Sequence, residues 1–440
     1  MLDLLEKFGA NTLYVIAAFG IVMLVTVFML LDLQSTRVVQ YMFMTAPIWL
    51  PVITLFLFHE YWFYYVRKEF DLGYGRTTIE IKIPQEIFKS PEAMELVLIQ
   101  LYQTASPDNH KESWIDGKHP PTTSLELVSR GGDVRFYMNV PKKRFKDLCE
   151  VQLYAHYPGI EVHELDIDYT AEVPWDPKRF VYFMFHMGLK KADAYPIKTY
   201  IEYGLDKMPK EEEKVDPINT VLEILGSINS EEHIWIQILI EANKEWTFKE
   251  GALFKTPDWK EAARGEIQKI IDTAVKKRGG EEEVRGSSMM LLTETEKDTI
   301  RAIERSLGKL AFNTIIRCVY ICPPTNVRIG DIIPRMITMW RAYEDINRNS
   351  IGFKWRTDVD WPWWQDPSGK LRLAMKETQL DEYKRRTLSP QSTSYGPGVM
   401  TTEELATIYH FPGKVATTPT LGRIPSKRAE APANLPTGTL

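Results

Sequence analysis

Residues 123–140, TSLELVSRGGDVRFYMNV, predict a β-hairpin at the centre of a β-rich module. Apolar and polar residues alternate in residues 123–128, as expected of a strand with one buried face, and residues 134–140 form the returning strand. Between them, Gly131 and Gly132 are free to adopt the positive φ angles that a tight turn requires. The hairpin therefore indicates an antiparallel sheet.

The elements on either side of this hairpin predict a split βαβ module over residues 70–168. Residues 77–84 (TTIEIKIP) alternate as a strand, and Ser90, Pro91 and Glu92 begin a helix with an N-cap, a proline and an acid. Pro141 opens a second helix, and residues 160–165 form a last strand. The order β-α-β-β-α-β is that of a ferredoxin-like sandwich, with two helices on one face of the sheet.

Strands and helices alternate again in residues 178–356, which predicts a second, elaborated ferredoxin-like module. The strand candidates are residues 179–187, 197–203, 232–241 and 312–322. Helices are expected over residues 216–228, 255–278, 293–310, where Thr293 and Glu296 form a capping box, and 329–346. The fold class is therefore α+β, and the two modules are candidates for a diverged tandem repeat.

Two uncharged apolar runs, residues 12–31 and 38–58, predict a transmembrane helical hairpin within residues 1–68. About 20 apolar residues cover the roughly 30 Å hydrocarbon core of a bilayer. Aromatic residues and then Arg67 and Lys68 follow the second run, which places both termini in the cytoplasm. A signal peptide before a buried helix is the disfavoured alternative, because the basic start that such a peptide needs is missing.

The composition changes in residues 357–440, where tryptophans cluster and prolines punctuate an expected extended tail. A capping box at Thr401 predicts a short helix over residues 403–409, ended by Phe411, Pro412 and Gly413. Extended, aromatic segments commonly lie on a partner protein. The predicted partner-docking residues are Trp361, Trp363, Trp364, Tyr409, Phe411 and Pro412.

Basic residues near the tryptophans give an alternative, a site for single-stranded nucleic acid. Lys384, Arg385 and Arg386 are the expected contacts, because aromatic rings stack on bases and cations neutralise phosphates. Acids and prolines interrupt the tryptophan cluster and oppose phosphate binding, so the protein-docking interpretation is favoured.

Charge and motif content argue against several other function classes. The net charge of −5 gives no global basic field for nucleic acid or anionic lipid. Cys149, Cys318 and Cys322 make no disulfide framework, and no second pair completes a metal site with Cys318 and Cys322. The sequence has no complete phosphate loop, no GxSxG and no HExxH. We therefore expect no cofactor, no metal and no catalytic residue, and a protein that is not an enzyme.

Several segments resemble the N-terminal half of bacterial type IV secretion or conjugative DNA-transfer ATPases of the coupling type. The resemblance lies in residues 124–158, 312–322, 361–367 and above all 401–436 (TTEELATIYHFPGKVATTPTLGRIPSKRAEAPANLP). In that family a membrane hairpin and an accessory region precede a RecA-like motor with Walker motifs. This chain ends near residue 440, about where the motor would begin, so no catalytic residue of the family is carried over.

The resemblance implies a membrane-anchored, non-catalytic accessory or scaffold subunit of a secretion or conjugation apparatus. Its expected place is the bacterial cytoplasmic membrane, with several passes and the bulk of the chain in the cytoplasm. The expected partners are the lipid bilayer, a separate RecA-like ATPase or other secretion subunits, and further copies of the chain. Binding of single-stranded nucleic acid is the alternative within the same apparatus.

Overall fold

A single ten-stranded sheet runs through the computed structural model of the chain. The structure describes residues 20, 35–84, 89–207, 215–256, 258–278, 292–356, 366–388, 396–413 and 423–424. The strand order is β10 (Arg423–Ile424), β1 (Arg76–Pro84), β3 (Asp133–Pro141), β2 (Thr123–Arg130), β6 (His233–Ala242), β7 (Ala311–Cys322), β5 (Val181–Leu189), β8 (Ile351–Arg356). In addition, β4 (Glu161–Glu164) pairs with β1, and β9 (Gly398–Thr401) pairs with β7. The mixed α+β class with an antiparallel sheet is confirmed.

The first half of the sheet contains the predicted hairpin and its neighbours. The element order is β1, α4 (Glu92–Leu101), β2, β3, α6 (Lys142–His156), β4, with the short α5 (His110–Trp114) between α4 and β2. In the sheet these strands lie in the order β4-β1-β3-β2. The hairpin turn needs glycine, because Gly131 has a φ of 56° and an added Cβ would lie 2.7 Å from the carbonyl oxygen of Ser230.

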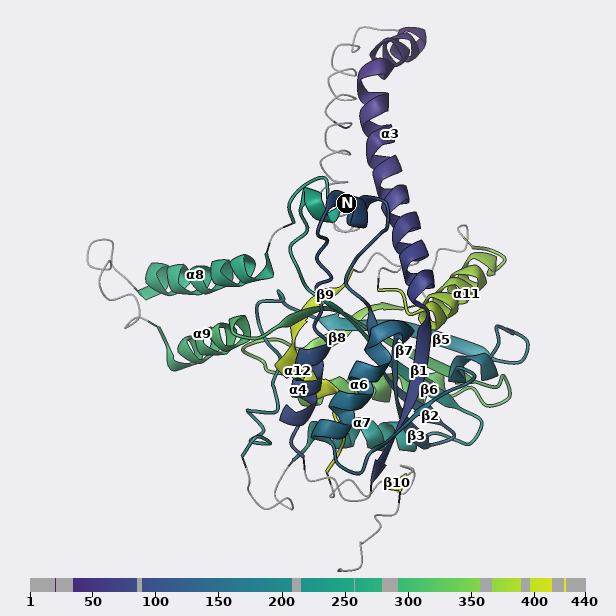
Figure 1. The fold of residues 1–440 in the computed structure, drawn as a ribbon, viewed down its shortest axis with the longest axis vertical. Coiled ribbons are helices and arrows are strands. Elements are labelled where there is room, and N and C mark those ends of the chain that lie inside the picture. Colours follow the sequence, from purple (N-terminus) through teal and green to yellow (C-terminus); the bar gives the residue numbers. More distant parts are fainter. Residues whose placement is uncertain are drawn as a thin grey trace, which may run out of the picture.

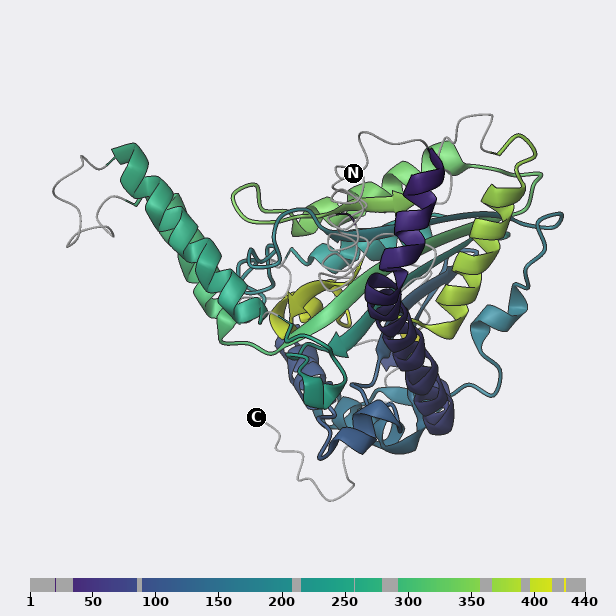
Figure 2. The same cartoon turned by 90° about the horizontal axis from the view of Figure 1, so that it is seen from above.

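The second half has the same strand order as the first. Its elements are β5, α7 (Pro217–Gly226), β6, β7, α10 (Ile329–Thr338) and β8, and the strands lie in the order β6-β7-β5-β8. Two helices, α8 (Trp259–Arg278) and α9 (Glu294–Leu307), are inserted between β6 and β7, and they extend away from the sheet together (Figures 1 and 2). The two halves join through antiparallel pairing of β6 with the whole length of β2.

Two predictions in the second half are wrong. Residues 197–203 form turns rather than a strand, because side chains of a later helix satisfy their backbone: Ile197 N donates to Glu404 Oε1 (3.0 Å) and Tyr200 N donates to Thr407 Oγ1 (3.0 Å). The helix expected over residues 329–346 ends at Thr338, and a 3₁₀ turn, η5 (Met339–Tyr343), follows it. The edge strand β8 was not predicted.

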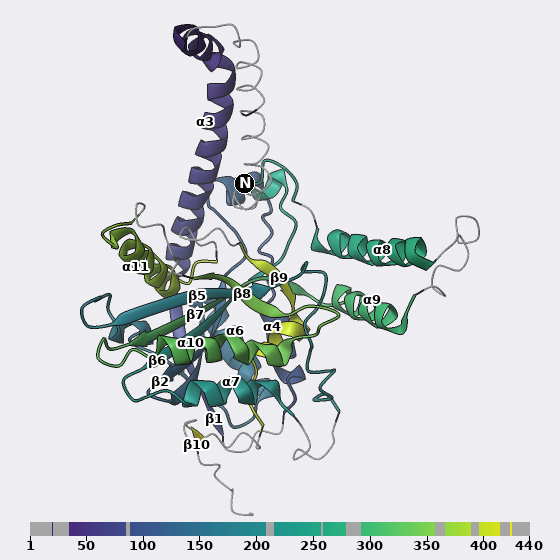
Figure 3. The ribbon, with the colours of Figure 1, turned by 180° about the vertical axis from the view of Figure 1, so that it is seen from behind.

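Helices cover both faces of the sheet. Side chains of α4, α6, α7, α10 and α12 (Thr402–Ile408) share one hydrophobic core with one face, and Figure 3 shows α7 and α10 on this side. The other face packs against α11 (Lys370–Arg385). Alternation along β6 separates the cores, because Ile234 and Ile236 belong to the first and Trp235 to the second.

One long helix, α3 (Ser35–Tyr74), leads into β1 and projects from the body (Figure 1). It contains the predicted apolar run 38–58, with Pro47 and Pro51 inside the helix. The other run, 12–31, lies outside the described residues except for Gly20. Within the part of the chain that the structure describes, no helix is long and apolar enough to cross a membrane.

Candidate functional site

The N-terminal half of α3 exposes large apolar side chains over more than half of its circumference. Exposed fractions reach 75 % at Ile48 and 65 % at Leu57. Because successive residues of a helix are rotated by about 100°, the half-buried Trp49, Ile53 and Phe56 occupy the remaining face, and the exposed set covers about 220° of the circumference. Its members are Met44, Ile48, Leu50, Val52, Leu55, Leu57 and Phe58. A helix that is apolar all round is normally enclosed by other helices or by lipid.

Below this apolar half, α3 becomes aromatic and then basic. Tyr61, Tyr64 and Tyr65 remain exposed, and Arg67 follows them. The Arg67 guanidinium lies over the rings of Phe63 (5.2 Å) and Trp246 (4.5 Å). Burial lowers the pKa of Arg67, but its stem and charge are held against these aromatic faces. The helix therefore carries an apolar segment, an aromatic segment and a cation in that order.

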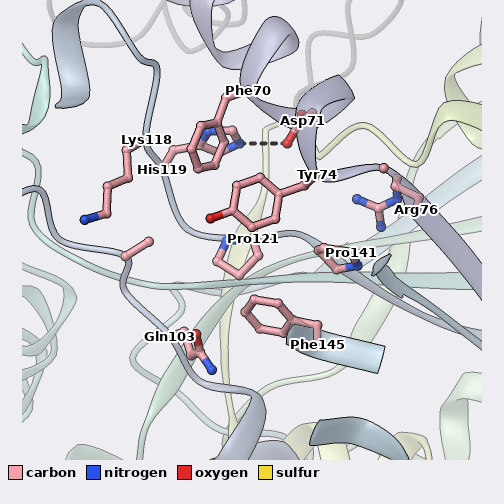
Figure 4. Close-up of a pocket in the computed structure, with 12 residues that line it drawn as sticks. Phe70, Asp71, Tyr74, Arg76, Gln103, Lys118, His119, Pro121, Pro141 and Phe145 are labelled. Carbon is pink, nitrogen blue, oxygen red and sulfur yellow. Dashed lines mark ion pairs between the residues drawn. The ribbon is translucent and has the colours of Figure 1, made fainter. Parts of the chain in front are cut away.

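A cavity of about 140 Å³ lies where α3 meets the sheet (Figure 4). Aromatic and proline side chains supply much of its wall, and charged groups stand beside them. The lining residues at the α3 end are Phe70, Asp71, Tyr74 and Arg76; those from the body include Lys118, His119, Pro121 and Phe145. The cavity is therefore lined by apolar and charged side chains together.

His119 and Asp71 form an ion pair at the edge of this cavity. His119 Nε2 lies 3.2 Å from Asp71 Oδ1, and His119 Nδ1 lies 2.9 Å from the carbonyl oxygen of Gly117. Both ring nitrogens therefore face oxygen atoms. Burial raises the pKa of Asp71, but the hydrogen bond and charge of His119 outweigh it, and the pKa is lowered overall. The pair ties α3 to the 117–121 loop.

Arg76 is the second cation beside the cavity. Its Nε donates to Asn139 Oδ1 (2.7 Å) and its Nη2 donates to the carbonyl oxygen of Thr122 (2.9 Å). Burial lowers the pKa of Arg76 to about 10, and repulsion from Arg386 acts in the same direction. These bonds fix the first residue of β1 to β3, so the arginine positions the end of α3.

The described residues offer no evident centre for metal chemistry. No group of three or more His, Cys, Asp or Glu side chains in the described ranges is arranged to hold a metal ion. Cys149, Cys318 and Cys322 are buried, and burial raises the pKa of all three thiols. Burial therefore disfavours a thiolate at each position.

The basic residues predicted for nucleic acid do not form one exposed surface. Lys384 Nζ donates to the carbonyl oxygen of Val173 (2.9 Å), and Arg385 is exposed and pairs with Asp381 (2.8 Å). Arg386 is buried with a φ of 54°, and its Nε and Nη2 donate to Glu126 (2.8 and 3.2 Å). The three consecutive basic residues therefore lie in three different environments.

Arg386 is the centre of a buried polar network between α11 and the sheet. Its Nη2 also donates to Asp168 Oδ2 (2.8 Å), while Tyr169 donates to Glu126 Oε2 (2.8 Å) and lies 2.9 Å from the hydroxyl of Tyr383. Burial raises the pKa of Glu126, but the charge and hydrogen bonds of Arg386 outweigh it, so the carboxyl pKa is lowered. The network fastens the end of α11 to β2.

The partner-docking prediction is wrong for the residues that follow α12. Tyr409, Phe411 and Pro412 are buried, and the Phe411 ring packs against Phe136 (5.3 Å) and Tyr157 (4.8 Å). These side chains fill the core between α12 and the first half of the sheet, so they are not available to a partner. Trp361, Trp363 and Trp364 lie outside the described residues.

Sequence reasoning also missed the ionic contacts that hold α12 in place. Glu403 accepts a hydrogen bond from Thr199 Oγ1 (2.6 Å) and pairs with Arg305 Nη2 (3.1 Å), and Lys309 pairs with Glu95 (2.6 Å). The capping box of Thr401 and Glu404 predicted the helix, but it did not predict that the helix is buried. No local pattern reveals these partners, because they are about 100 to 300 residues away in sequence.

Comparison with known proteins gives a family without an assigned role. The family model described as "Domain of unknown function (DUF8128)" matches residues 75–422. The match begins directly after α3 and includes every described strand except β10. No curated protein matches the chain.

Proposed function

Because the chain belongs to the DUF8128 family, whose description names no activity, we propose a function from the structure: a membrane-anchored platform that holds a partner at a lipid bilayer. The N-terminal half of α3 lies in the bilayer, and the sheet with its helices is the platform. The sequence prediction of a membrane hairpin, in which the run 12–31 precedes the run 38–58, belongs to the same proposal.

The observation that carries this proposal is the apolar surface around α3. Leaving side chains such as Ile48, Leu50, Leu55 and Leu57 in water costs about 1.5–3 kcal/mol each relative to burial. Although no described helix is by itself long and apolar enough to cross a membrane, the sequence run 38–58 carries no charge and would be about 30 Å long as a helix, close to the thickness of a hydrocarbon core. The tyrosines and Arg67 that follow have the chemistry of a membrane interface.

The body has the construction of a platform. The two halves of the sheet join through β2 and β6, and β9 and α12 add a second connection, because β9 pairs with β7 while α12 packs against α4 and α7. Partly buried ion pairs such as Lys309 with Glu95 reinforce this connection. A rigid body on a membrane anchor supplies position to a partner, and catalysis is not part of the proposed role.

The resemblance to conjugative and secretion ATPases supports a RecA-like ATPase as the first partner to test, at the cytoplasmic membrane of a bacterium. Deletion of residues 401–440 is unsuitable for this test, because α12 and Phe411 belong to the core. Deletion of residues 425–440 leaves every described element intact. If the ATPase docks on residues 425–440, we expect this deletion to abolish co-purification with the ATPase. Unchanged co-purification contradicts docking through these residues.

The anchor is tested by flotation of the full chain with phosphatidylcholine vesicles. A charged residue in the middle of a membrane helix costs about 3 kcal/mol. The double variant Leu50→Asp, Leu55→Asp therefore loses about 6 kcal/mol of insertion free energy, or roughly ten-thousandfold in partition. Leu72→Asp is the matched control, because Leu72 is 78 % exposed on the same helix beyond the aromatic segment. Flotation of the double variant as complete as that of the unaltered chain rules out α3 as the anchor.

A further inference from the structure

We propose that a collar around α3, formed by residues 109–115 and 247–254, is a second lipid-contact surface whose apolar tips enter the bilayer interface. The collar contains α5 and the 3₁₀ turn η3 (Phe248–Glu250). Both turns lie beside α3, above the sheet, in Figures 1 and 3. This inference rests on the proposed membrane anchor and adds an assigned contact in the body of the protein.

The collar exposes large apolar side chains although it is packed against the helix. Phe248, Phe254 and Ile115 have exposed fractions of 58 %, 48 % and 60 %. They come from two segments more than 130 residues apart in sequence that the fold brings together, since Trp114 Nε1 donates to the carbonyl oxygen of Phe248. A shared set of exposed aromatic and aliphatic tips is unusual on a surface that faces only water.

Direct contacts with α3 fix the height of the collar along the helix. The Phe254 ring stacks on Phe56 at 6.2 Å, and the Trp114 ring lies 5.7 Å from His59 and 5.1 Å from Phe63. Phe56 lies about 3 Å along the axis from Phe58, the last residue of the uncharged run. When that run is in the hydrocarbon core, the collar is therefore at the level of the headgroups.

Hydrogen bonds and one glycine hold the collar against α3 at this height. Trp62 Nε1 donates to the carbonyl oxygen of Trp114 (2.6 Å), and His59 Nε2 lies 3.1 Å from the carbonyl oxygen of Gly251. Gly251 has a φ of 93°, and an added Cβ would lie 2.2 Å from the Phe63 ring. The approach is too close for any other residue, so the collar and the helix form one unit.

The charges of this region favour contact with uncharged lipid. Three lysines pair locally: Lys118 with Glu112 (2.7 Å), Lys244 with Glu250 (3.5 Å) and Lys255 with Glu245 (3.0 Å). The remaining charges in residues 108–118 and 244–255 are two acids and two lysines, Asp108, Lys111, Asp116 and Lys249. Because these sum to zero, attraction to an anionic surface does not drive the contact. Insertion of the apolar tips does, as for other interfacial segments.

The test uses single-cysteine labelling of the full chain on vesicles. Cys149, Cys318 and Cys322 are buried, so an environment-sensitive thiol dye labels an introduced surface cysteine selectively. Lys249→Cys and Ile115→Cys place the dye in the two collar segments, and Lys249→Cys leaves the aromatic tips intact. Leu55→Cys reports on the anchor, and Leu96→Cys on α4 reports on the body. The vesicles are phosphatidylcholine, with a nitroxide on the headgroup of a fraction of the lipid.

We expect the dye at residues 249 and 115 to shift to shorter wavelength on vesicle binding and to lose at least half of its emission to the nitroxide. The dye at residue 96 is unaffected, and raising the salt concentration changes none of these results. Quenching at residue 55 without quenching at 249 and 115 overturns the collar and leaves the anchor standing. Absence of quenching at residue 55 overturns the anchor and the collar together. Collar quenching that salt abolishes overturns the apolar contact.

Discussion

Replacing Arg386 with methionine tests the buried network in which the sequence had suggested a nucleic-acid contact. Methionine keeps the length and the Cβ of arginine, so the cost of the positive φ angle is the same in both proteins. The substitution leaves Glu126, which is inaccessible to solvent, without its cation. Breaking a buried ion pair from one side costs about 3–5 kcal/mol, because an uncompensated charge stays in the interior.

Arg385 supplies the matched control one residue away. It has the same chemistry, but its pair with Asp381 is exposed and worth less than about 1 kcal/mol. We therefore expect Arg386→Met to have a much lower free energy of unfolding than Arg385→Met. The measurement is urea unfolding of the full chain in detergent micelles, followed by tryptophan fluorescence. Adding Glu126→Gln to Arg386→Met should restore about 1–3 kcal/mol, since the buried charge is then gone.

The pH dependence gives the sign of the effect. Burial raises the pKa of Glu126, but Arg386 lowers it overall, so in the native protein this contribution is present above the unfolded pKa of about 4.3 and is lost as the pH falls through the folded value. In Arg386→Met the charge and hydrogen bonds that lower the pKa of Glu126 most are gone, so burial is expected to raise that pKa. The stability deficit of the variant should therefore shrink between pH 8 and pH 5.5. A deficit that equals that of Arg385→Met, or that does not change with pH, refutes the account of this network.

Three further predictions concern single contacts. Phe411→Ala should lower the free energy of unfolding in urea by about 3–5 kcal/mol, because the ring is buried. A loss below about 1 kcal/mol would contradict burial of the Phe411 ring. Gly251→Ala should increase proteolysis of the collar, because the new Cβ overlaps Phe63, and an unchanged digestion rate would contradict this packing. The lowered pKa of Asp71 stabilises the protein above the unfolded pKa of about 3.9, and this contribution is lost as the pH falls through the folded value. Asp71→Asn should therefore lower the free energy of unfolding by up to about 1 kcal/mol at pH 7 and by less at acid pH. An unchanged free energy of unfolding at pH 7 would contradict a stabilising pair with His119.

The strands were predictable where apolar residues at every second position form one buried face. Ile79, Ile81 and Ile83 alternate in the sequence and are all buried on one face of β1. Residues 197–203 show a similar apolar pattern, but their backbone bonds to Glu404 and Thr407 of α12, so they form turns. The pattern identified the isoleucines that β1 buries, but it could not show which groups satisfy the backbone of residues 197–203.

The site residues were harder to predict because their roles depend on distant partners. Glu403 and Glu404 resemble the exposed first turn of a surface helix, yet both are buried against groups that come from elsewhere in the chain. Arg386 belongs to a basic run, yet its partner Glu126 is 260 residues away. The apolar run of α3 was visible in the sequence, because its composition alone carries that signal.

The most direct test of the central claim is a spin-label accessibility scan of α3 in the full chain on phosphatidylcholine vesicles. Labels at Leu50 and Leu57 lie on one side of the helix, a label at Leu55 lies roughly 140° around the axis from Leu50, and a label at Leu72 lies beyond the aromatic segment. A helix in the bilayer predicts greater accessibility to oxygen than to a water-soluble nickel complex at the first three positions, and the reverse at Leu72. Equal preference for the nickel complex at all four positions would contradict a membrane anchor.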